Sequence, residues 1–266
     1  MIAYISPGPW RDGLTLVLGV LTGVLSGAFG VGGAIVATPG VRLLGASTFL
    51  AVGTTLPAIV PGAVAATARY AREGLIDWRT VAAAAPAGMV AAIIGSLAAH
   101  AVPGDGHWLM VLTAVLLALA AIRMGRSVMV PRTVPGGTSP ARQRRAPAAA
   151  GVGASAGLLS GLLGVGGGLL LVPGFGQLLG LPVKHAIATS LACVGIIAVP
   201  GALTHALLGS VDWRMAGLLA LAAVPGARLG AAVAVAADDT RLRLIVALAL
   251  GIVAVIYAAT EVAAMV

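Results

Sequence analysis

Charged residues are scarce in this chain: Asp, Glu, Lys and Arg make up only 9% of its 266 residues, while 59% are hydrophobic. About a quarter of an ordinary soluble domain is charged, so this shortage excludes that class. Apolar runs of about 18–24 residues recur, and each is long enough to cross ~30 Å of hydrocarbon as a helix. We therefore expect an all-α, polytopic membrane protein with about eight transmembrane helices, drawn at residues 14–37, 48–70, 80–101, 107–124, 148–172, 185–208, 215–237 and 242–263.

Acidic residues and cysteine are also scarce, and this excludes several kinds of site. No Asp or Glu lies deep in a predicted span, which removes the usual proton relay and the usual sodium-binding carboxylate. The single cysteine, Cys193, excludes an intrachain disulfide. The histidines lack metal-ligand spacing. The Gly-Lys-Ser/Thr that ends a phosphate-binding loop does not occur. We expect neither a metal nor a cofactor.

The chain repeats one unusual sequence. Residues 23–34 read GVLSGAFGVGGA and residues 157–168 read GLLSGLLGVGGG. The correspondence continues downstream, where Thr54-Thr55-Leu56 returns as Thr189-Ser190-Leu191 and Asp77-Trp78-Arg79 returns as Asp212-Trp213-Arg214. A half-length duplication in an apolar chain predicts a transporter built from two structural repeats, with its site between them.

The duplication also divides the chain. We expect a first transmembrane repeat at 1–124, a cytoplasmic linker rich in Arg, Pro and Gly at 125–147, and a second repeat at 148–266, with four helices in each repeat. Four full spans in each half imply parallel repeats. If the glycine-rich segments are re-entrant, the count in each half becomes odd and the repeats are inverted. The sequence leaves both arrangements open.

The glycine-rich segments predict broken helices in spans one and five. Each glycine costs a helix about 1 kcal/mol relative to alanine, and Gly32, Gly33, Gly166 and Gly167 lie in two such clusters. Free N–H groups at the start of a half-helix attract anions. The alternative is close helix packing through small residues. Two copies of the cluster favour breaks that form a site for a small anion.

Polar side chains inside the spans are the remaining candidates for the site. Arg228 lies near mid-membrane, where a cation usually faces the bundle interior and here would balance a bound anion; the alternative is snorkelling to the interface. His205 aligns with Tyr70 and lies near a span end, where interfacial packing is the alternative. The paired hydroxyls that would complete an anion site, unless they bond back to their own helices, are Thr54, Thr55, Thr189 and Ser190.

Basic residues predict the orientation. With eight full spans, both termini and the loops at 71–79 and 209–214 share one side of the membrane. Most Arg residues fall on that side, which places both termini in the cytoplasm by the positive-inside rule. The net charge of +8 is thus a topology signal. We expect a small anion and membrane lipid as partners and no nucleic acid; a homodimer is left open.

These motifs resemble the sulfite exporter TauE/SafE family. The resemblance is carried by Leu-Ser-Gly-x-x-Gly-Val-Gly-Gly-Gly-x-x-x-x-Pro at 159–173, by Thr189-Ser190-Leu191, by Asp212-Trp213, and by looser copies in the first half. It covers nearly the whole chain apart from the linker. It implies a polytopic transporter of the bacterial inner membrane, associated with sulfite, sulfoacetate and other organosulfonates.

We therefore expect a secondary transporter, and more specifically an exporter, of small sulfur-containing anions. One alternative is a passive anion channel of the same fold. Another is an intramembrane serine hydrolase that uses Ser160 and His205. It is disfavoured because Tyr70 replaces the histidine in the first half and no orienting carboxylate lies in the spans. The chain is not expected to be an enzyme.

Overall fold

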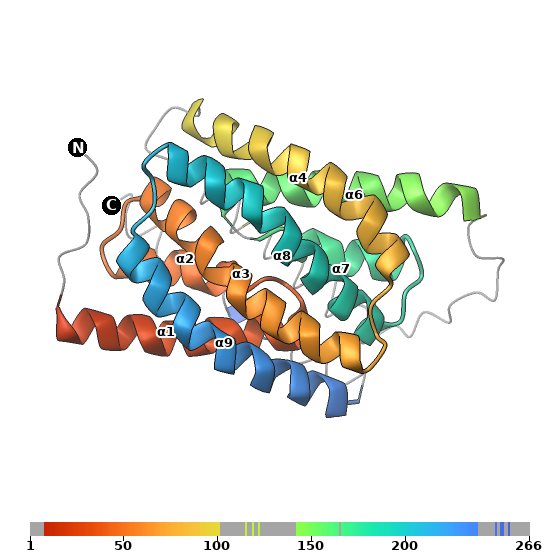
Figure 1. The fold of residues 1–266 in the computed structure, drawn as a ribbon, viewed down its shortest axis with the longest axis horizontal. Helices are drawn as coiled ribbons and strands as arrows, with labels where there is room; N and C mark the ends of the chain where they lie inside the picture. The colour runs from red at the N-terminus through yellow and green to blue at the C-terminus, as the bar shows by residue number, and fades with distance from the viewer. Residues whose placement is uncertain are drawn as a thin grey trace.

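The protein is an all-helical membrane protein, as the sequence predicts. The computed structural model describes residues 8–101, 115, 119, 122, 142–164, 166–238, 248, 251, 252 and 255. Within them, six helices are long and apolar enough to span a membrane. These are α1 (Pro9–Phe29), α3 (Thr48–Arg72), α4 (Trp78–Ala101), α6 (Arg142–Leu163), α8 (Val183–Leu207) and α9 (Trp213–Ala236) (Figure 1). Most of the spans drawn at 107–124 and 242–263, and most of the 125–147 linker, lie outside the described residues.

Two short helices complete the set of helices whose bounds the structure gives. α2 (Ala34–Leu43) follows α1, and α7 (Gly168–Gln177) follows α6. The spans drawn at 14–37 and 148–172 therefore each correspond to a long helix and the start of a short one. The glycines between them have positive φ, a left-handed conformation that ends a right-handed helix and that glycine adopts without a Cβ penalty. They are Gly30, Gly32, Gly33, Gly164, Gly166 and Gly167.

Each short helix folds back along the long helix before it. Gly33, at the start of α2, lies against Thr22 and Ser26 of α1, whereas Gly40, further along α2, lies against Leu18. The order of contacts is reversed, so α2 runs antiparallel to α1. In the same way, Gly167 lies against Ala156 of α6 and Gly174 lies against Val152. Each glycine segment is therefore a hairpin bend and not a step along a single span.

Two helix pairs pack backbone to backbone through small residues. Gly19, Gly23 and Gly27 of α1 face Ala222, Ala223 and Ala227 of α9, in the same order along both helices. Gly153, Gly157 and Gly161 of α6 face Ala84, Gly88 and Ala92 of α4 in the same manner. A Cβ atom on the central glycine of either triplet would overlap a backbone carbonyl of the partner helix. The spacing of four is the small-xxx-small pattern that lets membrane helices approach closely, and both pairs are parallel.

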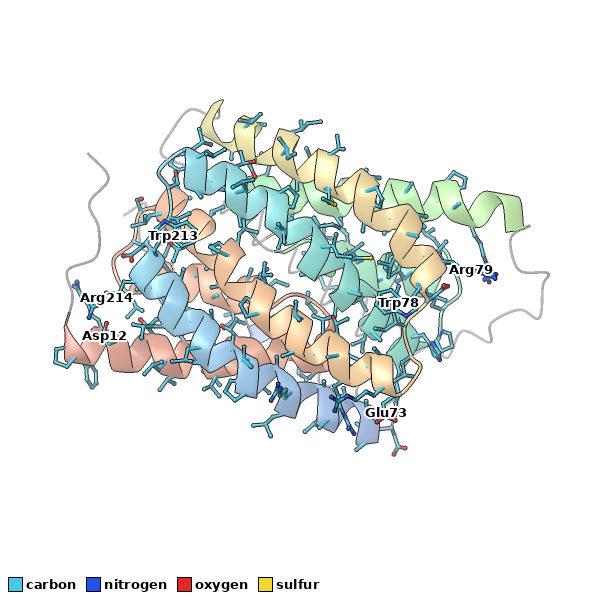
Figure 2. The ribbon with its side chains drawn as sticks, viewed as in Figure 1. Asp12, Glu73, Trp78, Arg79, Trp213 and Arg214 are labelled. Carbon is cyan, nitrogen blue, oxygen red and sulfur yellow. The ribbon has the colours of Figure 1, made fainter. Side chains whose placement is uncertain are left out.

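The centre of the bundle is an antiparallel pair, α3 and α8. Gly195 of α8 lies against Ala63 of α3, while Gly201 lies against Leu56. The C-terminal ends of these two helices therefore point to opposite ends of the bundle. Figure 2 shows the consequence: Trp78 and Arg79 lie at one end, and Trp213 and Arg214 lie at the other. The expectation that loops 71–79 and 209–214 share one side is wrong, because it assumed that the glycine segments are crossed as full spans.

The glycine contacts generate a stability prediction. Gly23→Ala would push α1 away from α9, because the added Cβ overlaps the Ala223 carbonyl. Overpacking of this kind costs about 1–3 kcal/mol. Gly217→Ala is the matched control, since open space surrounds Gly217 on α9, and this change should stabilise the helix by up to about 1 kcal/mol. Thermal unfolding of the detergent-purified protein should give a lower Tm for the first variant only. Equal Tm values would contradict backbone contact between α1 and α9.

Candidate functional site

The two glycine loops, which consist of residues 30–33 and of residues 164, 166 and 167, meet inside the bundle. A Cβ on Gly166 would lie 3.0 Å from the carbonyl oxygen of Gly32, and a Cβ on Gly32 would lie 3.3 Å from the oxygen of Gly166. Gly30 packs against Ile187 of α8, and Gly164 packs against Val52 of α3. The central helix pair therefore holds the two loops in contact, although they are more than 130 residues apart in the sequence.

Each glycine loop leads directly into the N-terminus of a short helix. Gly33 is the N-cap of α2 with φ +43°, and Gly167 is the N-cap of α7 with φ +68°; no side chain caps either helix. The first peptide N–H of each helix turns back to its glycine loop: Ala34 donates to Gly32 and Gly168 donates to Gly166. Each helix start also carries the positive end of the helix dipole, which attracts an anion.

Hydroxyl groups hold the loops in place. The Ser190 hydroxyl donates to the carbonyl oxygen of Gly30 at 2.7 Å. In the other half, the Thr38 hydroxyl donates to the carbonyl oxygen of Gly164 at 3.3 Å and lies 3.1 Å from the hydroxyl of Thr55. Ser190 and Thr55 thus contact the loops directly or through one hydroxyl. Sequence reasoning missed Thr38, because Val172 takes its place in the second half and no repeat marks it.

The hydroxyls of Thr54 and Thr189 bind peptide groups away from the glycine loops. The Thr54 oxygen accepts the peptide N–H of Asp212, the N-cap of α9, at 2.9 Å. The Thr189 oxygen accepts the peptide N–H of Asp77, just before α4, at 3.0 Å. Both oxygens face the connecting loops at the bundle ends, so each joins the central helix of one half to a helix of the other half.

His205 and Tyr70 occupy matching positions beside the ends of α6 and α1. Both side chains are fully buried. The Tyr70 hydroxyl donates to the carbonyl oxygen of Gly27 at 2.6 Å, and Nε2 of His205 lies 3.2 Å from the carbonyl oxygen of Gly161. Each glycine is one turn before its glycine loop. Both side chains therefore bind carbonyls near the C-terminal ends of the broken helices.

Arg228 is not brought to the glycine loops. Gly226 and Gly230 of α9 pack against α1, while the Arg228 side chain is exposed. Small residues are needed where α9 touches α1, so the long side chain lies outside that contact. Asp212, at a helix end, is the one charged residue among the buried residues that the structure describes. No Lys or Arg is buried among the described residues, and the arginine expected to balance an anion, Arg228, is exposed instead.

Three buried hydroxyls near the helix breaks form no hydrogen bond within the part of the chain that the structure describes: Thr22, Ser26 and Ser160. They are 3%, 4% and 1% exposed. A buried polar group without a partner costs about 1–3 kcal/mol, so such groups need an explanation. Ser26 and Ser160 are in the repeated motif. Thr22 was missed because Ala156 replaces it in the second half.

The roles of Thr54 and Thr189 can be tested by stability. Thr54→Val leaves the buried N–H of Asp212 without an acceptor, which should cost about 1–3 kcal/mol. Thr189→Val should cost less, because its bond to Asp77 is only partly buried. Thr54→Ser keeps the oxygen and should restore most of the stability. Thermal unfolding measures all three. A Thr54→Val variant with wild-type Tm would show that this bond is not structural.

Comparison with known proteins connects this architecture to a family. The family model described as "Sulfite exporter TauE/SafE" matches residues 15–257. "Probable membrane transporter protein YunE" of Bacillus subtilis (strain 168) is 27% identical over 245 residues, covering 83% of this chain and 87% of the relative. A "Probable membrane transporter protein" of Xylella fastidiosa (strain 9a5c) is 29% identical over 225 residues, covering 82% of each. No solved structure matches the chain.

A similar protein also occurs in an archaeon. "Probable membrane transporter protein MJ0441" of Methanocaldococcus jannaschii is 23% identical and covers 90% of this chain and 92% of the relative. The family match spans almost the whole chain and includes both glycine loops. The chain belongs to the sulfite exporter TauE/SafE family and is a multi-pass membrane transporter rather than an enzyme.

Proposed function

We propose that the protein is a secondary transporter that exports small sulfur-containing anions, such as sulfite, sulfoacetate or other organosulfonates, across a bacterial inner membrane. The observation that carries the proposal is the contact between the two glycine loops, each followed directly by a helix N-terminus. Broken helices whose N-termini point at an anionic group are a recurring device of secondary transporters. The family's name supports the sulfur-containing substrate class.

In this proposal the backbone binds the anion. The anion would lie at the positive ends of α2 and α7, beside Gly32, Gly33, Gly166 and Gly167, where an added Cβ would meet neighbouring protein atoms. Thr55 and Ser190 position the loops, and His205 holds the end of α6. Thr54 and Thr189 support the site from the bundle ends. Arg228 is given no role in binding, because its side chain is exposed.

We further propose that the site lies between two inverted repeats, within residues 1–124 and 148–266. Three observations support inversion. α3 and α8, which correspond in sequence, are antiparallel; α1 runs parallel to α9; and α6 runs parallel to α4. Because short loops reverse the chain between α3 and α4 and between α8 and α9, α1 and α6 must also run in opposite directions. Each glycine segment then contributes a hairpin and no net crossing.

This arrangement changes the expected orientation. The helix ends near Trp78 carry most of the basic residues of the described helices, namely Arg69, Arg72, Arg79, Arg142, Arg144, Arg145 and Lys184. The helix ends near Trp213 carry Arg11, Arg42 and Arg214. The positive-inside rule then favours a cytoplasmic Trp78 end. Asp12 near the start of α1 pairs with Arg214, so this places the start of α1 outside, the reverse of the sequence expectation.

Cysteine labelling tests the orientation. In a Cys193→Ala background, Arg79→Cys and Arg214→Cys introduce thiols at matching positions of the two halves. A membrane-impermeant maleimide added to intact spheroplasts should label Arg214→Cys and should label Arg79→Cys only after permeabilisation. Labelling of both from outside would contradict the inverted arrangement, and the opposite pattern would reverse the orientation.

Transport energetics give a second test. The acids in the described helical region, Asp12, Glu73, Asp77, Asp212 and Asp238, all lie at helix ends, so no carboxylate there serves as a proton or sodium site inside the bundle. The membrane potential contributes about 2.3 kcal/mol per charge per 100 mV. Because 1.4 kcal/mol corresponds to a tenfold concentration ratio, this gives a roughly fiftyfold outward gradient for a singly charged anion. We therefore expect electrogenic efflux.

The measurement uses proteoliposomes loaded with sulfite or sulfoacetate and clamped with potassium and valinomycin. Efflux should rise with a negative interior, saturate with substrate, and need neither a sodium nor a pH gradient. Protein-free liposomes are the control. Efflux that ignores the potential but requires an ion gradient would refute electrogenic export. Single-channel currents in planar bilayers would instead indicate a passive channel.

A further inference from the structure

We propose that Thr22 and Ser26 of α1, together with the N-terminus of α2, form the principal binding pocket for a singly charged oxyanion. This inference rests on the proposed transport of anions by the glycine loops. The inference names two residues that would contact the substrate and specifies a single negative charge on the substrate. It also assigns most of the substrate contacts to the first half of the chain.

The geometry brings both hydroxyl-bearing side chains to the start of α2. A Cβ at Gly33, the N-cap of α2, would lie 2.6 Å from Cγ2 of Thr22 and 3.2 Å from Cβ of Ser26. Thr22 and Ser26 are one turn apart on the same face of α1. They border a ten-residue helix whose N-cap side chain is absent. Two hydroxyl-bearing side chains therefore lie beside the positive end of the α2 dipole, where the peptide N–H of Ala34 donates to the carbonyl oxygen of Gly32.

The hydroxyls of Thr22 and Ser26 behave differently from others in the bundle. Thr15 of α1 donates to the Arg11 carbonyl at 2.8 Å, and Thr204 of α8 donates to the Pro200 carbonyl at 2.9 Å. This back-bonding is the ordinary way for a helical hydroxyl to be satisfied. Thr22 and Ser26, at 3% and 4% exposure, form no hydrogen bond among the described residues. A bound anion would accept from both.

The second half of the chain has fewer hydroxyl groups beside the N-terminus of α7, the helix that corresponds to α2. Ser160 corresponds to Ser26 and is likewise buried without a hydrogen bond among the described residues. Ala156 stands where the first half has Thr22, and it packs against Gly167, the N-cap of α7. One hydroxyl is thus available near α7 and two near α2. An oxyanion between the loops gains more hydrogen bonds on the α2 side.

The lack of a lysine or arginine in the pocket selects the charge of its ligand. No Lys or Arg is buried among the described residues of the bundle. The desolvation cost of an ion grows with the square of its charge, whereas its attraction to fixed dipoles grows only in proportion to the charge. A doubly charged oxyanion would pay about four times the cost for about twice the attraction. Hydroxyls and peptide N–H groups without a cation therefore favour a single negative charge.

The test measures binding and stability of the full chain in detergent by titration calorimetry and thermal unfolding. The probes are methanesulfonate, which is singly charged, and sulfate, which is doubly charged with similar oxygen geometry. Thr22→Val and Ser26→Ala remove the two hydroxyls. Thr15→Val is the matched control, because Thr15 lies on the same helix, is equally buried, and has a hydrogen-bond partner.

The pocket substitutions should change the Kd but not lower the Tm, whereas the control substitution should lower the Tm but not change the Kd. Thr22→Val and Ser26→Ala should each raise the Kd for methanesulfonate at least tenfold, because a hydrogen bond to an ion is lost, while the Tm without ligand stays the same or rises. Thr15→Val should lower the Tm and leave the Kd within about twofold. Sulfate should bind the wild type at least tenfold more weakly than methanesulfonate.

Unchanged Kd values in both pocket variants would overturn the pocket while leaving anion transport intact. Equal affinity for sulfate and methanesulfonate would overturn the selection of a single charge. If the wild type bound neither these probes nor sulfite or sulfoacetate, the proposed function and this inference would both fail. A Tm that falls in Thr22→Val as in Thr15→Val, with Kd unchanged, would assign Thr22 a structural role only.

Discussion

The structure depends on the need to satisfy the backbone where helices stop inside the bundle. Hydrocarbon offers no hydrogen bonds, so a broken helix is tolerated only where protein or a cavity supplies partners. Here the central pair of helices, together with α2, supplies them. Ser190 of α8 binds the carbonyl of Gly30, and a hydroxyl from α2 binds that of Gly164. Tyr70 and His205 bind carbonyls one turn earlier. The C-terminal ends of both broken helices are thus bonded, while the N-termini of α2 and α7 receive no side-chain cap.

Glycine serves two separate purposes in this chain, and the structure distinguishes them. In the loops, Gly33 and Gly167 adopt positive φ and reverse the chain. In the helices, triplets such as Gly19, Gly23 and Gly27 bring α1 and α9 into backbone contact. The second use joins helices from opposite halves of the sequence. It leaves α1 with α9 and α6 with α4 as closely packed pairs on either side of α3 and α8.

The interior that results is polar, and no Lys or Arg is buried among its described residues. Hydroxyls, one imidazole and peptide groups surround the loops, and within the described residues the buried charge is confined to Asp212 at a helix end. Such an interior costs less to bury than one with ions, and in the proposed transport it would receive an anion without first breaking an ion pair. The proposed carrier would benefit, because a site that binds through dipoles and hydroxyls can also release its ligand.

The sequence alone determined the class and pointed to the two glycine clusters. Low charge, long apolar runs and the duplicated glycine clusters predict a helical membrane transporter. Gly32 and Gly166, which lie in contact, both belong to the repeated glycine motif. Only the tertiary structure decided which way α2 leaves its loop, which face of α9 carries Arg228, and which hydroxyls lack partners. The reason is physical. The local sequence pattern indicates whether one segment forms a helix, whereas these features depend on contacts between segments far apart in the chain. The helix α2 turns back along α1, which places Gly33 beside Thr22 and Ser26. Small residues of α9 face α1, and Arg228 lies on the exposed side of α9.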